Sequence, residues 1–146
     1  MGFVTALMPG PVGLDTAIFI YLIERHPTYE PLLVPLFQSL NEGALEACTS
    51  SITLLELLVK PYRSGDAELA ARYEAFLTQS RGLTLLSPDR QILHTAAHLR
   101  AARQVKTPDA LQLATALRAG CTAFLTNDRR LPTLPRLRIV QLSELV

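Results

Sequence analysis

The sequence contains no apolar run long enough to cross a bilayer. Charged or turn-forming residues interrupt every hydrophobic stretch before it reaches the roughly 18–20 residues that a spanning helix needs. The first eleven residues, MGFVTALMPGP, also lack the basic start and the long apolar segment of a signal peptide. With 49% hydrophobic and 18% charged residues, the chain is expected to be a soluble globular protein that is neither exported nor bound to a membrane.

Cysteine is scarce, and the two residues present, Cys48 and Cys121, lack the spacing of a metal site. Both lie among small and apolar neighbours, so we interpret them as buried reduced thiols, which suits a cytoplasmic protein. The 146 residues contain no repeat, low-complexity tract or linker, so we expect a single domain over residues 1–146. The net charge of +1 neither indicates nor excludes a nucleic-acid partner.

Short β-prone segments alternate with amphipathic helical patterns along the whole chain. This alternation predicts an α/β protein, a three-layer α/β/α sandwich around a mainly parallel sheet. In such sheets, ligands bind beyond the carboxyl ends of the strands. The expected strands cover residues 11–15, 45–50, 83–87, 121–127 and 137–142, and the expected helices cover residues 16–26, 29–43, 51–61, 65–82, 88–104 and 107–120.

Four acidic residues fall near the carboxyl ends of these strands. Asp15 follows the first strand directly, and Asp128 comes two residues after the segment TAFLT. Asp109 lies in the first turn of the helix before that strand, and Glu56 lies early in the helix after the second strand. Because these positions meet at one edge of the sheet, we expect the four carboxylates to share a site. Glu56 in particular needs a partner, since a charge in an apolar setting is costly unless it is paired.

Each acid also has a separate structural explanation. Asp15 is a good N-cap, Asp109 suits the positive end of its helix, Asp128 is a common turn residue, and Glu56 can occupy an exposed helix face. These explanations do not account for the recurrence of acids at one edge. Clustered carboxylates repel one another, so the group is expected to bind a divalent cation. Ligand sets made only of oxygens favour Mg²⁺ or Mn²⁺ over zinc.

These acids lie in four segments: GLDTAIFIYLIE, TSSITLLELLVKP, TPDALQLATALRAG and FLTNDRRL. In order and spacing, the segments resemble the motifs of PIN-domain ribonucleases, and most closely those of the VapC-type toxins of bacterial toxin–antitoxin pairs. The resemblance extends over residues 13–145. Carried over by motif, the four acids are Asp15, Glu56, Asp109 and Asp128, and the polar residues that flank the last one are Thr126 and Asn127.

The resemblance implies a PIN-like fold, bound Mg²⁺ or Mn²⁺ and endonucleolytic cleavage of RNA. We expect Asp15 and Asp109 to be the main metal ligands, Asp128 to complete the site directly or through water, and Glu56 to position or deprotonate the attacking water. The products would then carry 5′-phosphate and 3′-hydroxyl ends. The resemblance also implies a homodimer and a cognate antitoxin that lays an apolar helix against the protein and obstructs the acidic site.

Two features depart from this resemblance. Many relatives carry another acid shortly after the last motif acid, whereas this chain has Arg129 and Arg130, which leaves open whether one or two metals bind. The leading MGFVTALMPGP is also longer than the usual start. Arg129 and Arg130, together with Lys60 and Arg63, are candidate contacts for RNA phosphates, although solvated surface charge explains them equally well.

Other functions fit the pattern less well. An interaction module that keeps the fold and leaves the acids unused is the main alternative. A phosphatase with an Asp nucleophile is less favoured, because LDTAIF lacks a second Asp two residues after Asp15. His94 and His98 have the i, i+4 spacing of zinc ligands, but without an HExxH glutamate a structural or surface role is favoured.

Overall fold

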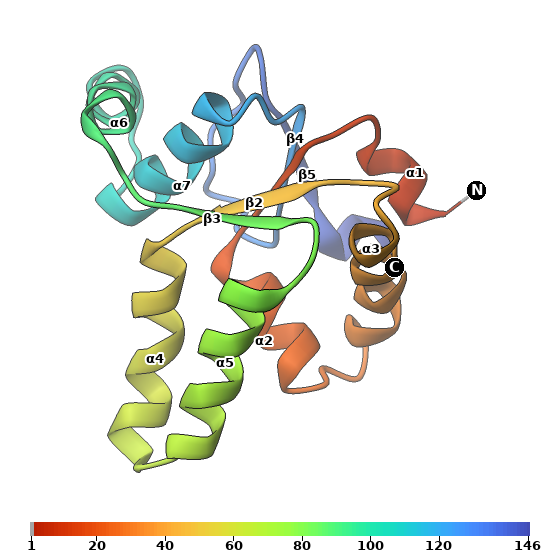
Figure 1. The fold of residues 1–146 in the computed structure, drawn as a ribbon. Coiled ribbons are helices and arrows are strands. Elements are labelled where there is room, and N and C mark those ends of the chain that lie inside the picture. The colour runs from red at the N-terminus through yellow and green to blue at the C-terminus, as the bar shows by residue number, and fades with distance from the viewer. Residues whose placement is uncertain (1) are drawn as a thin grey trace.

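A five-stranded sheet runs through the centre of the computed structural model, which describes residues 2–146 (Figure 1). All neighbouring strands are parallel and follow the order β3-β2-β1-β4-β5. The predicted α/β class and parallel sheet are confirmed. The strands are β1 (Val12–Leu14), β2 (Ala47–Ser50), β3 (Leu83–Leu86), β4 (Ala123–Thr126) and β5 (Arg138–Gln141).

Helices cover both faces of this sheet and make the sandwich three-layered. In Figure 1, α6 and α7 lie on one side of the sheet and α2, α4 and α5 lie on the other. No helix within residues 2–146 combines the length and apolar character that crossing a membrane requires. The helices are α1 (Phe3–Leu7), α2 (Thr16–Ile23), α3 (Glu30–Glu42), α4 (Ile52–Ser64), α5 (Ala67–Gln79), α6 (Arg90–Ala102) and α7 (Thr107–Arg118), and a short 3₁₀ helix, η1, covers Leu142–Leu145.

The leading segment, whose role was open from the sequence, contributes to the core. Apart from Met1, which lies outside the described residues, it forms α1 and the approach to β1. Leu7 is fully buried and belongs to the same apolar cluster as Leu33 and Leu36 of α3. The extra residues therefore extend the hydrophobic core on the α3 side of the sheet.

Gly13 in the middle of β1 brings α7 unusually close to the sheet. A Cβ atom at this position would lie 2.7 Å from a ring carbon of Phe124 and 2.9 Å from the Cβ of Ala116 in α7. Only glycine permits this approach, and the α7 residue that meets it, Ala116, is itself small and buried. The close packing holds the first turn of α7 near the carboxyl end of β1.

Capping residues mark the ends of two helices. The Asp66 side chain accepts a hydrogen bond from the Leu69 N–H at 3.0 Å at the start of α5, and Gly43 closes α3 with a φ of 81°. The helix expected to end at residue 61 instead continues to Ser64 and contains Pro61. A proline in the last turn removes only one backbone hydrogen bond, so the helix continues past it.

Candidate active site

The four predicted acids line one open cleft at the carboxyl edge of the sheet. Its volume is about 490 Å³. The acids come from four separate elements: the N-cap of α2, the second turn of α4, the first turn of α7 and the loop after β4. The cleft is lined by Asp15, Thr16, Ala17, Ile20, Tyr21, Glu56, Asp109, Asn127, Asp128 and Arg130.

Asp15 combines a structural role with a place in the cleft. Its Oδ1 accepts a hydrogen bond from the Thr16 N–H at 2.9 Å at the N-terminus of α2, and its Oδ2 accepts one from the Thr126 hydroxyl at 2.6 Å. Burial raises the pKa of Asp15, these two hydrogen bonds oppose the rise, and the charges of Glu56 and Asp128 add to it. Asp15 is therefore both the N-cap of α2 and part of the cleft lining.

Glu56 has a neutral partner within the protein. The Thr16 hydroxyl donates a hydrogen bond to Glu56 Oε1 at 2.6 Å and so joins the start of α2 to α4. Gln112 and Thr53 lie buried behind this pair, and the Gln112 Nε2 donates to the Thr53 hydroxyl at 2.6 Å. The sequence analysis did not identify Thr16, Thr53 and Gln112 as residues that support the cleft. Their position on the apolar faces of helices indicates this role, because buried polar side chains need hydrogen-bond partners.

Asp109 and Asp128 have opposite electrostatic environments. Burial raises the pKa of Asp109, and the negative charges of Asp128 and Asp15 add to that rise. Asp128 instead receives two hydrogen bonds from the Arg130 guanidinium, from Nε to Oδ1 and from Nη2 to Oδ2, both at 2.9 Å. This bidentate pair holds the pKa of Asp128 below its usual range. Arg130 therefore neutralises one acid of the cleft.

The two polar residues before Asp128 fix the loop after β4. The Thr126 hydroxyl accepts a hydrogen bond from the Asp128 N–H at 2.9 Å while it donates to Asp15. The Asn127 Oδ1 accepts one from the Ser143 N–H at 2.8 Å, and its Nδ2 donates to the Tyr21 hydroxyl at 3.3 Å. The loop is thus held to α2 on one side and to the C-terminal 3₁₀ helix on the other.

Of the four basic residues predicted to contact RNA, Arg130 alone is among the described residues that line the cleft. Lys60 and Arg129 instead make exposed ion pairs, with N–O distances of 3.5 and 3.4 Å, to acids outside it. Arg63 is exposed in the last turn of α4 and is not part of the lining. His94 and His98 are both exposed on α6.

The donor set suits a divalent cation in its chemistry, because the acids and hydroxyls of the cleft offer only oxygen ligands. The raised pKa values of Asp15 and Asp109 reflect in part negative charge that a cation would neutralise. Within residues 2–146, however, no three acidic, histidine or cysteine side chains are gathered closely enough to hold an ion in this arrangement. Asp128 is paired with Arg130, so a shared ligand shell requires that this pair open.

A family model described as PIN domain matches residues 12–137 of this chain. No curated protein matches the sequence significantly. The PIN match contains all four cleft acids.

Solved structures of toxin–antitoxin proteins share the fold. VapBC2 from Rickettsia felis, bound to a DNA fragment from its promoter, has a TM-score of 0.68 and 20% identity, and the alignment covers 89% of this chain and 97% of that one. DNA-bound VapBC from Salmonella typhimurium has a TM-score of 0.64 and 26% identity over 90% and 97% of the two chains. The Mycobacterium tuberculosis VapC20, described as a Sarcin-Ricin loop cleaving toxin, has a TM-score of 0.62 and 16% identity over 78% and 87%.

Proposed function

The chain belongs to the PIN domain family, and we propose that it is a Mg²⁺- or Mn²⁺-dependent endoribonuclease that acts as the toxin of a toxin–antitoxin pair. One observation carries the proposal: four carboxylates from four separate elements line a single cleft at the carboxyl edge of the sheet. Hydrolysis of a phosphodiester builds negative charge on the phosphoryl and leaving oxygens. A bound divalent cation supplies the stabilisation of that charge and lowers the pKa of bound water.

The side chains of the cleft divide this work. Asp15 and Asp109 are the proposed metal ligands, because both line the cleft and, besides burial, the negative charge of neighbouring acids raises the pKa of each. Asp128 joins them once Arg130 releases it. Glu56, oriented by the Thr16 hydroxyl, takes the proton of the attacking water. Water attacks the phosphorus, the bond to the 3′ oxygen breaks and that oxygen leaves with a proton, so the cut ends carry 5′-phosphate and 3′-hydroxyl groups.

The test is cleavage of a mixed RNA pool with Mg²⁺, with Mn²⁺ and with EDTA, followed by mapping of the cut ends. The parent protein should cleave only with metal, and Asp15→Asn should abolish cleavage. Asp89→Asn is the matched control, because Asp89 caps α6 through a 2.8 Å hydrogen bond from the Ile92 N–H, and asparagine caps a helix equally well. Ends with 2′,3′-cyclic phosphates would contradict the mechanism.

An inactive protein would point to the interaction module. A Mn²⁺ titration of the parent protein and of Asp15→Asn, monitored by the melting temperature, distinguishes a metal-dependent nuclease from an interaction module. Stabilisation by Mn²⁺ that requires Asp15 supports a metal-dependent nuclease whose substrate is absent from the pool. Failure of Mn²⁺ to stabilise the folded parent supports the module.

The proposed partner is a cognate antitoxin, since the structural neighbours from Rickettsia felis and Salmonella typhimurium are VapBC toxin–antitoxin proteins. Leu55, Val59 and Tyr62 recur at i, i+4 and i+7 on α4 and are 64, 40 and 66% exposed, and Ile20 of α2 lies in the cleft lining. An apolar stripe exposed beside a functional cleft is typical of a docking surface. We assign the antitoxin helix to this stripe, so Leu55→Asp should weaken neutralisation while cleavage persists.

The predicted homodimer is likewise a proposal. Light scattering coupled to size-exclusion chromatography measures the mass in solution directly. A mass near twice the 16.1 kDa of the chain supports the dimer, and a mass equal to one chain contradicts it.

A further inference from the structure

Basic residues are strongly concentrated in one part of the chain. Residues 90–138 contain nine of the 14 lysines and arginines but two of the 13 acids, and those two are the cleft acids Asp109 and Asp128. The remaining residues carry five basic and eleven acidic side chains. The net charge of +1 therefore hides a separation into a basic region and an acidic region, which produces a local positive potential.

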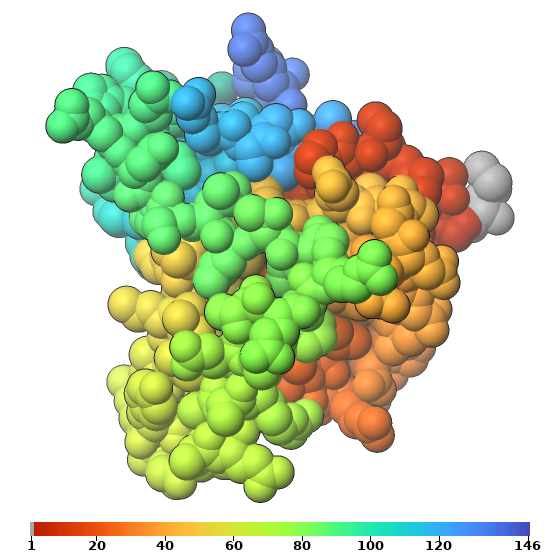
Figure 2. Space-filling view, in the orientation of Figure 1, coloured from red at the N-terminus to blue at the C-terminus, as the bar shows by residue number. Residues whose placement is uncertain are grey.

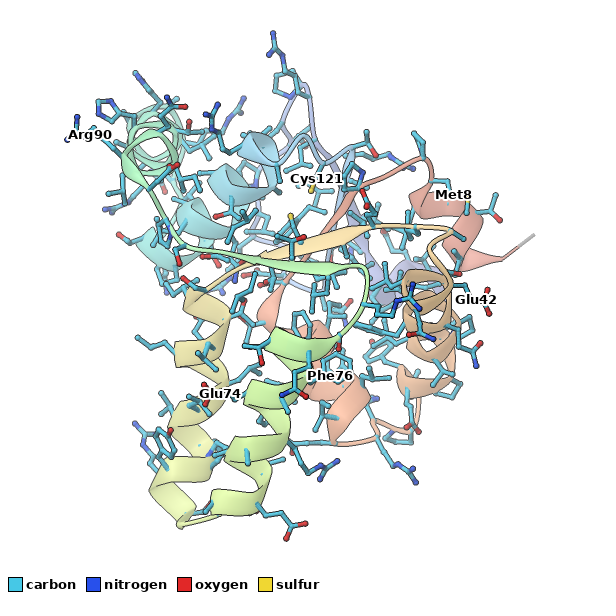
Figure 3. All side chains as sticks on the ribbon, viewed as in Figure 1. Met8, Glu42, Glu74, Phe76, Arg90 and Cys121 are labelled. Carbon is cyan, nitrogen blue, oxygen red and sulfur yellow. The ribbon has the colours of Figure 1, made fainter. Side chains whose placement is uncertain are left out.

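The basic region forms one side of the folded molecule. It comprises α6, α7, β4 and the connection from β4 to β5. Figure 3 shows nitrogen-tipped side chains, Arg90 among them, around α6 and at the tip of that connection. In Figure 2 the connection projects from the surface on the same side as α6 and α7. Outside the cleft, the acids that adjoin this region are Asp89, which caps α6, and Glu144, which pairs with Arg129.

Two surface hollows near the cleft are lined by residues of this region. A small hollow beside the cleft is lined by Gln104, Lys106 and Leu131, and it shares Asp109 and Arg130 with the cleft. A further hollow of about 310 Å³ lies between α6 and the connection to β5, with Arg103 and Arg136 in its lining. We refer to Arg103, Lys106, Arg130 and Arg136 as the basic track.

Among the described residues, three members of the basic track have no ion-pair partner, whereas the fourth, Arg130, is paired with Asp128. The Arg100 Nε donates a hydrogen bond to the Val105 carbonyl at 3.0 Å, and buried Val105 anchors the connection between α6 and α7. Arg103 and Lys106 flank this anchor and are exposed. Within residues 2–146, Arg103, Lys106 and Arg136 make no ion pair, so their charges are available to a ligand.

We propose that the basic track binds the phosphate backbone of a single RNA strand on its way into the cleft; this inference rests on the proposed nuclease function. Its four cations are distributed over the cleft, the adjoining small hollow and the hollow beside α6, which favours a polyanion longer than one nucleotide. Among the described residues that line the two hollows, His98 carries the one aromatic ring and no Phe, Tyr or Trp is present, so contacts to phosphate outnumber sites for base stacking. The track therefore supplies affinity without sequence preference.

The experiment measures binding of a labelled single-stranded RNA to the Asp15→Asn protein by fluorescence anisotropy over a series of KCl concentrations. The test variant adds Arg103→Gln and Arg136→Gln. The matched control adds Arg25→Gln and Arg81→Gln, which remove the same charge from exposed sites outside the basic region. The test variant should lower the slope of log affinity against log salt by about 1.4, since each contact with a single strand contributes roughly 0.7. The control should leave the slope unchanged.

The outcomes separate this inference from the nuclease proposal. Equal effects of the test and control variants would overturn the basic track, whether or not the parent protein cleaves RNA. Loss of slope in the test variant, together with a parent protein that does not cleave any RNA with metal, would keep the track and remove the nuclease. Tighter binding of duplex DNA through Arg103 and Arg136 would overturn the assignment to single-stranded RNA. A thermal melt of each variant confirms that it is folded.

Discussion

The Thr126 hydroxyl donates a hydrogen bond to Asp15 Oδ2 at 2.6 Å, and Thr126 itself is fully buried. The hydroxyl oxygen of Thr126 also accepts a hydrogen bond from the Asp128 N–H at 2.9 Å. Thr126, at the end of β4, thus positions two acids: Asp15, which follows the neighbouring strand β1, and Asp128, two residues after Thr126. Because the hydrogen bond favours the charged carboxylate, it opposes the rise in the pKa of Asp15 caused by burial.

Thr126→Val should therefore weaken both the site and the fold. The variant leaves the partly buried Asp128 N–H without its acceptor, which costs about 1 kcal/mol in the free energy of unfolding, the low end of the range for a fully buried group. Loss of a hydrogen bond to a site carboxylate should reduce metal affinity or cleavage by roughly 10–100-fold. Urea unfolding and Mn²⁺ titration measure the two effects. Thr126→Ser keeps the hydroxyl and should behave like the parent protein; equal losses in both variants would contradict the argument.

Arg130→Gln should release Asp128 for metal binding. In the parent protein the guanidinium holds both carboxylate oxygens at 2.9 Å and competes with any cation. We expect several-fold tighter Mn²⁺ binding by calorimetry and, at the same time, weaker RNA binding. Arg129→Gln is the control, since Arg129 pairs with Glu144 instead. Weaker Mn²⁺ binding in Arg130→Gln would show that the arginine supports the metal site.

The free energy of unfolding should depend on pH because the pKa values of Asp15 and Asp109 are raised in the folded protein. The folded-state pKa values of Asp15 and Asp109 are raised, so the folded protein binds protons more tightly than the unfolded chain. Their contribution is fully present below the ordinary carboxyl pKa and is lost as the pH rises through the raised values. Asp128 has a lowered pKa and acts in the opposite sense, losing its contribution as the pH falls.

Without metal, Asp109→Asn should therefore gain stability relative to the parent protein as the pH rises from about 4 to 7, the range above the ordinary Asp pKa. Urea unfolding in EDTA at several pH values measures the difference. Mg²⁺ should stabilise the parent at neutral pH and have little effect on the variant. A difference between the two proteins that does not change with pH would contradict the raised pKa of Asp109.

Gly13→Ala should disturb the site by displacing α7, the helix that carries Asp109. Its methyl group would meet the Phe124 ring and the Ala116 methyl, at 2.7 and 2.9 Å, and force α7 outward. Overpacking of this kind costs about 1–3 kcal/mol. Because α7 carries Asp109, cleavage should fall together with the midpoint of urea unfolding. Gly2→Ala, where the added Cβ has no neighbour nearer than 3.9 Å, should be neutral. An unchanged midpoint in Gly13→Ala would contradict the close packing of α7.

Much of the architecture could be predicted from local patterns. Alternating short apolar segments and capped helices specify a parallel α/β sheet, and Asp66 and Gly43 mark helix ends through bonds within a few residues. The grouping of Asp15, Glu56, Asp109 and Asp128 also followed, because parallel strands must end at the same edge. The partners of these acids did not follow. Thr16 and Glu56 are 40 residues apart, and Thr126 and Asp15 are 111 apart, so their contacts depend on the exact packing of helices on the sheet.

The sequence by itself thus determined the fold class, the order of its elements and which acids share an edge, since periodicity, capping and strand direction are local properties of the chain. Only the tertiary structure decided that Arg130 turns back onto Asp128 and that Gly13 lets α7 approach β1. It also decided that Arg103, Lys106 and Arg136 line hollows on the side of the molecule next to the cleft. These features depend on distances between side chains from separate elements, which side-chain volume and packing set in three dimensions.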